Sequence, residues 1–314
     1  MKVPHYTLII PHYDQPVLLE RLLSSVPVRD DLQVVVVDDG SHAENVAQLE
    51  FLKRKFPMVE FLMMPNNRGG GAARNEGLKV VQGDYVFFAD ADDYFFTDAL
   101  NALLDRCATQ ASADLICFNA KAIEEETGCP SNRADRLNWM MVQPEKEREQ
   151  LLRYQHSEPW CKLIRREIIV QNDLQFDEVP ILNDVRFSYL VGHYAERVLV
   201  ENSVCYCVCN CQNSVGKKMV AERKRAYTQV MVQTNQFFKQ NGLPYCYKRV
   251  YRPLVFSLSR WQWHDARVCM VELRHGGESV LSILLNVFLY PLWVIRWALR
   301  KRKYRRARIT TDFT

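Results

Sequence analysis

The chain has 314 residues, of which 48% are hydrophobic and 25% are charged. This composition supports a substantial buried core and excludes a disordered chain, and the length suits one domain with an appendage or two small domains. The net charge of +4 is local, because residues 296–314 hold eight basic side chains and one acid, leaving 33 basic and 36 acidic residues elsewhere. A slightly acidic body argues against a nucleic-acid-binding protein.

Apolar runs alternate with amphipathic stretches through the first 120 residues. Strands are predicted at 7–10, where Pro11 is expected to end the strand, and at 32–37, 59–64, 85–89 and 114–119. Helices are predicted from Pro16 onward, at 72–81 and at 97–109. Four consecutive valines in the second run indicate a strand buried on both faces, as in a parallel sheet. The sequence therefore predicts an α/β fold, with a Rossmann-like, mostly parallel sheet flanked by helices.

The pattern is less regular after residue 121. We expect an exposed excursion with a helix at 144–154, a return to the core at 160–163, a helix beginning near residue 183, an extended run at 198–211, and helices at 217–240 and 244–265. Four cysteines, at positions 205, 207, 209 and 211, alternate as in a metal site. Alternate residues of one strand lie about 7 Å apart on one face, whereas tetrahedral zinc needs converging ligands. We therefore expect buried thiols there.

An acidic cluster follows the fourth predicted strand. Asp90, Asp92 and Asp93 come directly after the apolar run from Tyr85 to Ala89. Neighbouring carboxylates repel one another, and Mg²⁺ or Mn²⁺ commonly binds one or two carboxylates together with substrate phosphates. We therefore expect a divalent cation that holds a nucleotide diphosphate at this loop. The alternative is an acidic strand-to-helix loop in which Asp93 or Thr97 caps the next helix.

Four motifs fall at one edge of the predicted sheet. They read LIIPHYD (8–14), VVDDGS (36–41), GGAARNEG (70–77) and GDYVFFADADD (83–93). In this order and spacing they resemble family 2 glycosyltransferases of the GT-A fold. The resemblance covers residues 5–120, and it continues more weakly to about residue 214. It does not specify the sugar.

The resemblance assigns a donor site to the first half of the chain. It implies that Tyr13 stacks on the nucleotide base, Asp39 accepts a hydrogen bond from that base, Asp90 contacts the ribose and Asp92 ligates Mn²⁺ or Mg²⁺. The other nucleotide-sugar contacts that it implies are Pro11, Asp38, Arg74, Asn75 and Ala91. Asp39 has an alternative as an Asx-turn residue, and Arg74 as the partner of a nearby Asp. His12 has no evident partner in the sequence, and we expect no metal role for it.

The acceptor half carries the candidate base. Relatives place a Glu-Asp pair at a helix start after the sheet, and this chain has Asn183 and Asp184 there. The resemblance therefore implies that Asp184 is the general base, and a single displacement with one base inverts the anomeric centre. A helix cap is the alternative for Asp184. Trp160 and Lys162 resemble an acceptor-side stretch, although Trp160 also suits a core position.

The C-terminal end has its own composition. Residues 280–299 are mostly apolar, with Pro291 expected to interrupt them, and seven of the nine residues at 300–308 are basic. A spanning helix needs about 20 apolar residues, so this segment is marginal as one. It fits an in-plane anchor, residues 280–308, on an anionic membrane surface. The alternatives are a packed helix with a solvated basic end, and a short transmembrane or re-entrant segment.

These expectations combine into one organisation. We expect a GT-A glycosyltransferase domain at 1–215, with a nucleotide-sugar half (1–120) and an acceptor half (121–215), then a helical extension (216–275) and the membrane-associating tail (276–314). Residues 1–4 lead directly into the first strand, so we expect no secretory signal and interpret the ten cysteines as reduced thiols of a cytoplasmic protein.

The expected function is the metal-dependent, inverting transfer of a sugar from a nucleotide-diphosphate sugar, a UDP-sugar, to a glycan or lipid-linked acceptor. Cell-surface polysaccharide synthesis at the inner face of the membrane is the expected setting. A non-catalytic, nucleotide-binding scaffold is the first alternative, supported only by Asn183. Nucleotidyl transfer is the second, but it requires a Gly-rich phosphate loop with a basic residue, which residues 11–14 lack. The sequence does not indicate an oligomeric state.

Overall fold

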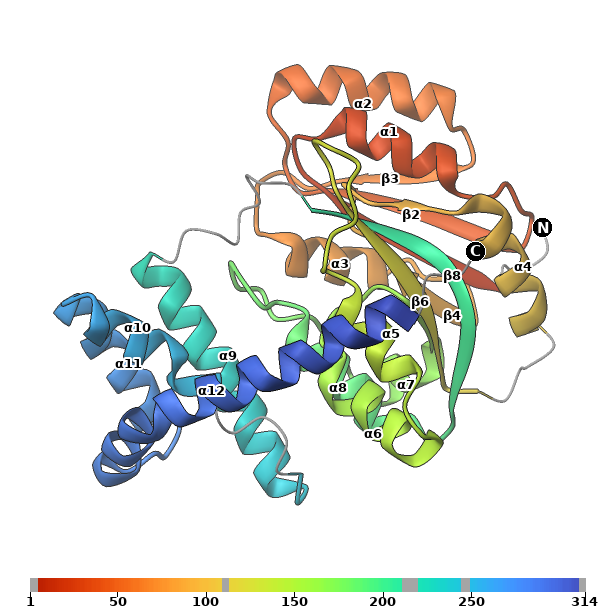
Figure 1. Cartoon of the computed structure of the whole chain (residues 1–314). Helices are drawn as coiled ribbons and strands as arrows, with labels where there is room; N and C mark the ends of the chain where they lie inside the picture. Colours follow the sequence, from red (N-terminus) through yellow and green to blue (C-terminus); the bar gives the residue numbers. More distant parts are fainter. Residues whose placement is uncertain (1–4, 109–112, 211–219, 244–248, 311–314) are drawn as a thin grey trace. The chain divides into compact units, whose positions relative to one another are not determined.

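The computed structural model describes residues 5–108, 113–210, 220–243 and 249–310. The chain forms two compact units. The first consists of Met1–Glu178 and Phe187–Gln212, and the second of Val179–Arg186 and Asn213–Thr314. In Figure 1 the first unit contains the sheet, and the second contains the helices labelled α9 to α12.

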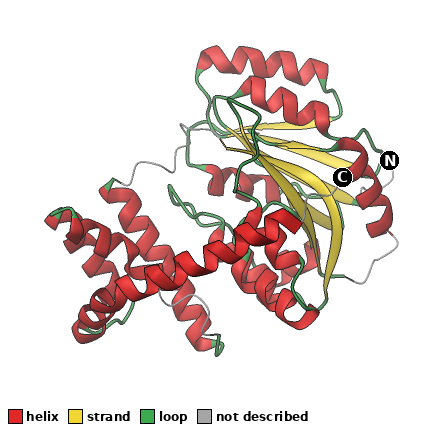
Figure 2. Ribbon diagram, in the orientation of Figure 1, coloured by secondary structure: helices red, strands yellow, loops and turns green. Residues whose placement is uncertain are grey.

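The first unit is built on one eight-stranded sheet, drawn in yellow in Figure 2. Its strand order is β3-β2-β1-β4-β7-β6-β8-β5. The strands are β1 (Tyr6–His12), β2 (Leu32–Asp38), β3 (Val59–Met63), β4 (Tyr85–Phe88), β5 (Tyr94–Phe95), β6 (Leu115–Glu124), β7 (Lys162–Arg165) and β8 (Val198–Asn210). Parallel pairing joins β1 to β2 and β4, β2 to β3, and β6 to β8, whereas β7 runs antiparallel to β4 and β6, and β5 to β8. The predicted α/β sheet is confirmed, with an antiparallel insertion that periodicity did not reveal.

The first strand is longer than predicted. It continues through Pro11 to His12, which lies opposite Asp38 of β2. The backbone oxygen of His12 accepts a hydrogen bond from the N–H of Asp39, so the backbone polar groups of His12 point toward β2. The backbone nitrogen and oxygen of Pro11 therefore point away from β2, toward β4. The pairing of β1 with β4 ends at Ile9 and Phe88, so the missing N–H of Pro11 breaks no ladder hydrogen bond.

Helices cover both faces of this sheet. Figure 1 shows α1 and α2 along one face and α3 on the other. The helices are α1 (Pro16–Ser25), α2 (Ala43–Lys55), α3 (Gly70–Leu78), α4 (Thr97–Ala108), α5 (Asp135–Met141), α6 (Glu145–Gln155), α7 (Arg166–Gln171) and α8 (Val185–Tyr194). A Cβ atom added at Gly77 would lie 2.6 Å from a methyl carbon of Ile9, so this glycine allows α3 to pack closely on β1. α3 begins two residues before the predicted start, because the turn is already made at Gly69, where φ is 90°.

The second unit is helical. It contains α9 (Ala221–Gln240), a short 3₁₀ helix (Arg249–Tyr251), α10 (Arg252–Ser259), α11 (Trp263–His275) and α12 (Val280–Thr310). α11 packs against α9 and α10. The single helix predicted at 244–265 is wrong, because Trp261 adopts a left-handed φ of 58° that separates α10 from α11. Residues 244–248 of that prediction, and 217–219 of the preceding one, lie outside the described residues.

The last helix, α12, includes both the apolar segment and the basic run. It continues through Pro291, where the sequence predicted an interruption. Pro291 is exposed, and the helix continues past it without the one backbone hydrogen bond that its missing N–H would donate. Within the described residues, the helices are too short or too polar to cross a bilayer.

Candidate functional site

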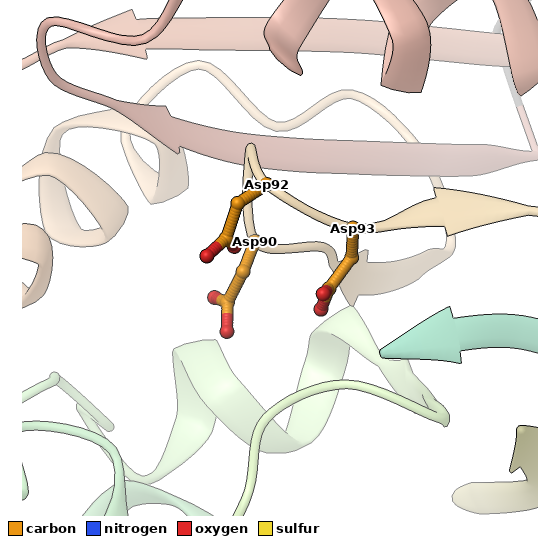
Figure 3. A group of neighbouring side chains, drawn as sticks. All are labelled: Asp90, Asp92 and Asp93. Atoms are coloured by element: carbon orange, nitrogen blue, oxygen red, sulfur yellow. The ribbon is translucent and has the colours of Figure 1, made fainter. Parts of the chain in front are cut away.

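The acidic cluster lies in the loop that joins β4 to β5. One carboxylate oxygen from each of Asp90, Asp92 and Asp93 lies within 4.8 Å of the others. Figure 3 shows the three side chains pointing to the same side of the loop. The four residues of β4 are all buried, so the strand is fixed in the sheet and delivers the loop to the edge where β1 and β2 also end.

This cluster concentrates negative charge. Two arginines contact it: Nη2 of Arg74 lies 2.6 Å from Oδ1 of Asp90, and the guanidinium of Arg21 donates to the backbone carbonyl of Asp92. Burial, followed by the charge of Asp90, raises the pKa of Asp92 to about 6. Burial also raises the pKa of Asp93 well above its usual value, and the charges of Asp90 and Asp92 add to this shift. Hard oxygen donors with excess negative charge fit Mg²⁺ or Mn²⁺, with Asp90 and Asp92 as the half-buried candidate ligands.

The third carboxylate is turned to β8. Oδ2 of Asp93 accepts a hydrogen bond from the hydroxyl of Tyr206 at 2.6 Å, and Oδ1 accepts one from the backbone N–H of Cys209 at 2.7 Å. Thr97 instead donates its hydroxyl to the carbonyl of Ser25 at 2.9 Å. Asp93 and Thr97 thus hold the loop to neighbouring elements, which the capping alternative did not anticipate. The sequence offered no signal for Tyr206, because 113 residues separate it from Asp93.

The end of β2 is held by a buried network. Oδ1 of Asp38 lies 2.8 Å from Nδ1 of His12 and 2.5 Å from the hydroxyl of Ser41. Nε2 of His12 accepts a hydrogen bond from the backbone N–H of Gln15 at 3.1 Å, so Nδ1 carries the proton that is donated to Asp38. Burial alone would raise the pKa of Asp38, but the hydrogen bonds from His12 and Ser41 outweigh it and lower the pKa. His12 therefore has the structural partner that sequence analysis missed.

Asp39 closes the neighbouring loop. Its two carboxylate oxygens each accept a backbone hydrogen bond at 2.7 Å, from Arg68 and from Gly69. Burial raises the pKa of Asp39 despite these hydrogen bonds. Asp39 therefore fixes the segment that leads into α3. Its contact with a nucleotide base stays a prediction.

Tyr13 offers an aromatic face at the same edge. Its side chain is exposed (38%), and it follows the network residue His12 directly. The next residue, Asp14, adopts a left-handed φ of 53° and accepts hydrogen bonds of 2.9 Å from the backbone of His42 and the side chain of Asn45. Asp14 thus holds the loop that presents Tyr13, and the exposed ring is available for stacking.

The two candidate residues on α3 reach different partners. Arg74 makes the ion pair with Asp90, as the structural alternative anticipated, and its guanidinium lies 5.4 Å from the ring centre of Phe176. Asn75 forms a pair of hydrogen bonds with the backbone of Phe176, donating at 3.0 Å and accepting at 2.8 Å. α3 therefore connects the acidic cluster to the segment around Phe176. Pro11 and Ala91 lie at the same edge, at the end of β1 and between Asp90 and Asp92.

The acceptor-side candidates are enclosed by protein. Trp160 is 3% exposed and stacks on Tyr206, with ring centres 5.9 Å apart, which suits its alternative as a core aromatic. Lys162 is 1% exposed and donates to the carbonyls of His156 and Glu158 at 2.7 Å. Their contact with an acceptor stays a prediction. The expected buried thiols are present at Cys205, Cys207 and Cys209, and position 211 lies outside the described residues.

The candidate base belongs to the second unit. Asn183 and Asp184 form the turn directly before Val185, the first residue of α8. Both side chains are half-buried. This position suits a helix start, as predicted, and the role of Asp184 stays a prediction.

The chain is similar to known glycosyltransferases. The uncharacterized glycosyltransferase YibD of Escherichia coli is 28% identical over 181 residues, which are 54% of this chain and 52% of YibD. Staphylococcus aureus TarS, a poly(ribitol-phosphate) beta-N-acetylglucosaminyltransferase, is 25% identical over 211 residues, which are 64% of this chain and 35% of TarS. The chain spans about half the length of the curated relatives it matches.

Solved structures share the fold. TarS 1-349 in complex with UDP-GlcNAc has a TM-score of 0.57 and 19% identity, with 86% of this chain and 92% of that chain covered. The mannosyltransferase PcManGT of Pyrobaculum calidifontis, in complex with GDP-Man and Mn²⁺, has a TM-score of 0.51 and 17% identity, with 98% and 86% covered. Residues 7–171, more than half of the chain, match the family model described as glycosyl transferase family 2. The chain therefore belongs to glycosyl transferase family 2.

Proposed function

We propose that this protein is a metal-dependent, inverting glycosyltransferase that uses a UDP-sugar donor. The acceptor is a glycan or lipid-linked glycan of cell-surface polysaccharide synthesis. One observation carries the proposal. In this family 2 chain, the carboxylates of Asp90 and Asp92 converge at the sheet edge where β2 also ends, at Asp38 and Asp39. That edge of an α/β sheet is where ligands bind.

The donor is bound by the loops after β1, β2 and β4. The exposed ring of Tyr13 stacks on the base, and Asp39 accepts a hydrogen bond from a ring N–H, which suits uracil. Asp90 contacts the ribose while Arg74 holds its carboxylate in place. Pro11, Asp38, Asn75 and Ala91 shape the surrounding pocket. The complex of TarS with UDP-GlcNAc supports a uridine nucleotide, whereas the GDP-Man complex of PcManGT keeps the donor base open to test.

The metal is Mn²⁺ or Mg²⁺, held by Asp92 with Asp90 beside it. When bound, such an ion neutralises the charge that develops on the departing diphosphate. The convergent oxygen donors support this assignment, and so does the raised pKa of Asp92, which reflects first the burial of this carboxyl and then the charge of Asp90. The Mn²⁺ in the PcManGT complex is consistent with it.

Asp184 is the base of the transfer. Its carboxylate takes the proton of the acceptor hydroxyl as that oxygen bonds to the anomeric carbon and the bond to the diphosphate breaks. A nucleoside diphosphate leaves, and the anomeric configuration is inverted by the single displacement. Asn183 precedes this base where relatives carry an acid, so a scaffold that binds nucleotide without transfer is the competing function.

The protein acts at an anionic membrane surface, through α12. Seven exposed apolar residues of α12 lie on one side of the helix, at spacings that fit its turns: Leu281, Leu284, Leu285, Phe288, Leu292, Ile295 and Leu299, whereas the exposed Val280 and Val294 lie off this side. This spacing forms one stripe along the helix, and seven of the nine residues that follow, 300–308, are basic. An apolar stripe beside a cationic run complements the acyl chains and anionic headgroups of one leaflet. We infer that the protein is peripheral on the inner face of the cell membrane, where a lipid-linked acceptor would be held.

A panel assay tests this function. The purified chain is incubated with UDP-, GDP- and TDP-sugars, with and without Mn²⁺, and release of nucleoside diphosphate is measured. Mn²⁺-dependent release from a UDP-sugar is expected. UDP binding without release from any donor, in the presence of a glycan acceptor mixture, supports the scaffold, and release from GDP-sugars alone contradicts the uridine assignment.

A further inference from the structure

One buried hydroxyl links both ends of the acidic loop. The hydroxyl of Tyr206, on β8, accepts a hydrogen bond from the backbone N–H of Asp90 at 2.9 Å. The same hydroxyl donates to Oδ2 of Asp93 at 2.6 Å. Tyr206 has no exposed surface, so water does not compete for these hydrogen bonds. A single side chain therefore fixes the loop at its first and last acidic residues.

The strand that carries Tyr206 holds the loop at further points. The backbone N–H of Cys209 donates to Oδ1 of Asp93 at 2.7 Å, so β8 engages both oxygens of that carboxylate. Directly after the loop, β5 pairs with β8 and places Phe95 opposite Tyr206. The loop closes on itself through a hydrogen bond of 3.1 Å from Asp93 N–H to the carbonyl of Asp90. β8 thus determines the path of the backbone between the two half-buried carboxylates.

The ring of Tyr206 is itself held in place. Trp160 stacks on it with an interplanar angle of 25°, and Phe95 packs on it with ring centres 5.0 Å apart. A ring fixed on two sides keeps its hydroxyl at one position. The enclosed Trp160 consequently has a structural part in the site, through Tyr206.

We propose that Tyr206 is a positioning residue that sets the spacing of the Asp90 and Asp92 carboxylates for a divalent cation and the diphosphate it accompanies. The proposal rests on the proposed metal-dependent function. Removing the hydroxyl leaves the Asp90 N–H and Oδ2 of Asp93 each without a buried partner, although Cys209 still donates to Oδ1 of Asp93, so the loop must shift to find new partners. Metal affinity depends on such supporting hydrogen bonds, and their loss typically costs about 10- to 100-fold.

The test compares two full-length variants that each lose one buried hydroxyl. Tyr206→Phe removes the bridge, whereas Tyr6→Phe removes a hydrogen bond of 2.7 Å to the carbonyl of Leu104, which involves no residue of the loop. Mn²⁺ binding in the presence of saturating UDP is measured by calorimetry, and the unfolding midpoint is measured for each protein. We expect Mn²⁺ affinity to fall about tenfold or more in Tyr206→Phe and to be unchanged in Tyr6→Phe, at similar unfolding midpoints.

The outcomes separate the two proposals. Equal Mn²⁺ affinity in wild type and Tyr206→Phe overturns the role of Tyr206 and leaves the metal-dependent function standing. Absence of Mn²⁺ binding to wild type with UDP overturns both. If Tyr206→Phe does not fold, hydrogen exchange of the metal-free wild type replaces this comparison. Slow exchange of the Asp90 amide supports a loop that Tyr206 holds in place before metal binds, and fast exchange contradicts it.

Discussion

Arg74 and Asp90 form an ion pair of 2.6 Å at the edge of the sheet, with the arginine buried and the aspartate about one-third exposed. The pair joins α3 to the loop after β4, so the two predicted donor-binding motifs are in direct contact. Arg74 also lies over the ring of Phe176. Its side chain therefore has an electrostatic partner and a packing partner.

Replacing Arg74 tests this contact. Arg74→Gln should destabilise the fold by about 1–3 kcal/mol, because it removes a hydrogen bond to a charged group that is partly screened from water. It should also raise KM for the donor, since Asp90 loses its orientation. Arg68→Gln is the control, because Arg68 pairs with Glu178 at an exposed site and should change stability by less than about 1 kcal/mol. Equal urea midpoints for the two variants would contradict the structural role of Arg74.

Gly40 provides a matched test of the loop after β2. It has a φ of 70°, and a Cβ atom there would lie 2.6 Å from the backbone carbon of Asn66. Gly128 has a φ of 66° with open space around the same position. Gly40→Ala should therefore destabilise by about 2 kcal/mol or more, and Gly128→Ala by about 1 kcal/mol, since both are strained but only one is crowded. Thermal unfolding of the two variants measures the difference, and a larger loss in Gly128→Ala would refute the packing argument.

Asp14 should make the stability of the first unit depend on acid pH. Burial alone would raise its pKa, but hydrogen bonds from Asn45 and His42 lower it to about 2. A carboxyl whose pKa is lower in the folded state contributes stability above its unfolded pKa of 3.8, and this contribution is lost as pH falls toward 2. Asp14→Asn should flatten that part of the profile, and asparagine tolerates the left-handed backbone at this position. Urea unfolding between pH 5 and about pH 2 measures the slope; an unchanged slope would exclude Asp14 as its source.

The stripe on α12 should govern membrane binding. Phe288 is 80% exposed, and Phe288→Asp should weaken binding to vesicles containing phosphatidylglycerol by about tenfold or more, since a buried phenylalanine contributes roughly 1.5–3 kcal/mol. Val28→Asp, at a position 95% exposed in the first unit, should leave binding unchanged. Cosedimentation measures both variants. Equal binding to vesicles with and without phosphatidylglycerol would contradict the proposal. A change of oligomeric state in Phe288→Asp would indicate instead that a second copy of the chain covers the stripe.

The sequence predicted the features that are local. The valine run of β2 is buried as expected, and each donor-side motif lies at the end or start of its element, because periodicity and turn residues act over a few positions. Tyr206 was not predicted, since its hydrogen bonds reach residues more than a hundred positions away. The break at Trp261 was missed as well, because an aromatic residue carries no signal for a left-handed backbone.

The most direct measurement is nucleoside diphosphate release by wild type beside Asp92→Asn and Asp184→Asn, with and without Mn²⁺. We expect release that requires the metal and that falls at least about 100-fold in each variant, since one variant loses a metal ligand and the other loses the base. Unfolding midpoints close to that of wild type would exclude misfolding as the cause. Release that persists in both variants, or that proceeds equally without a divalent cation, would contradict the assignment of metal and base to these residues.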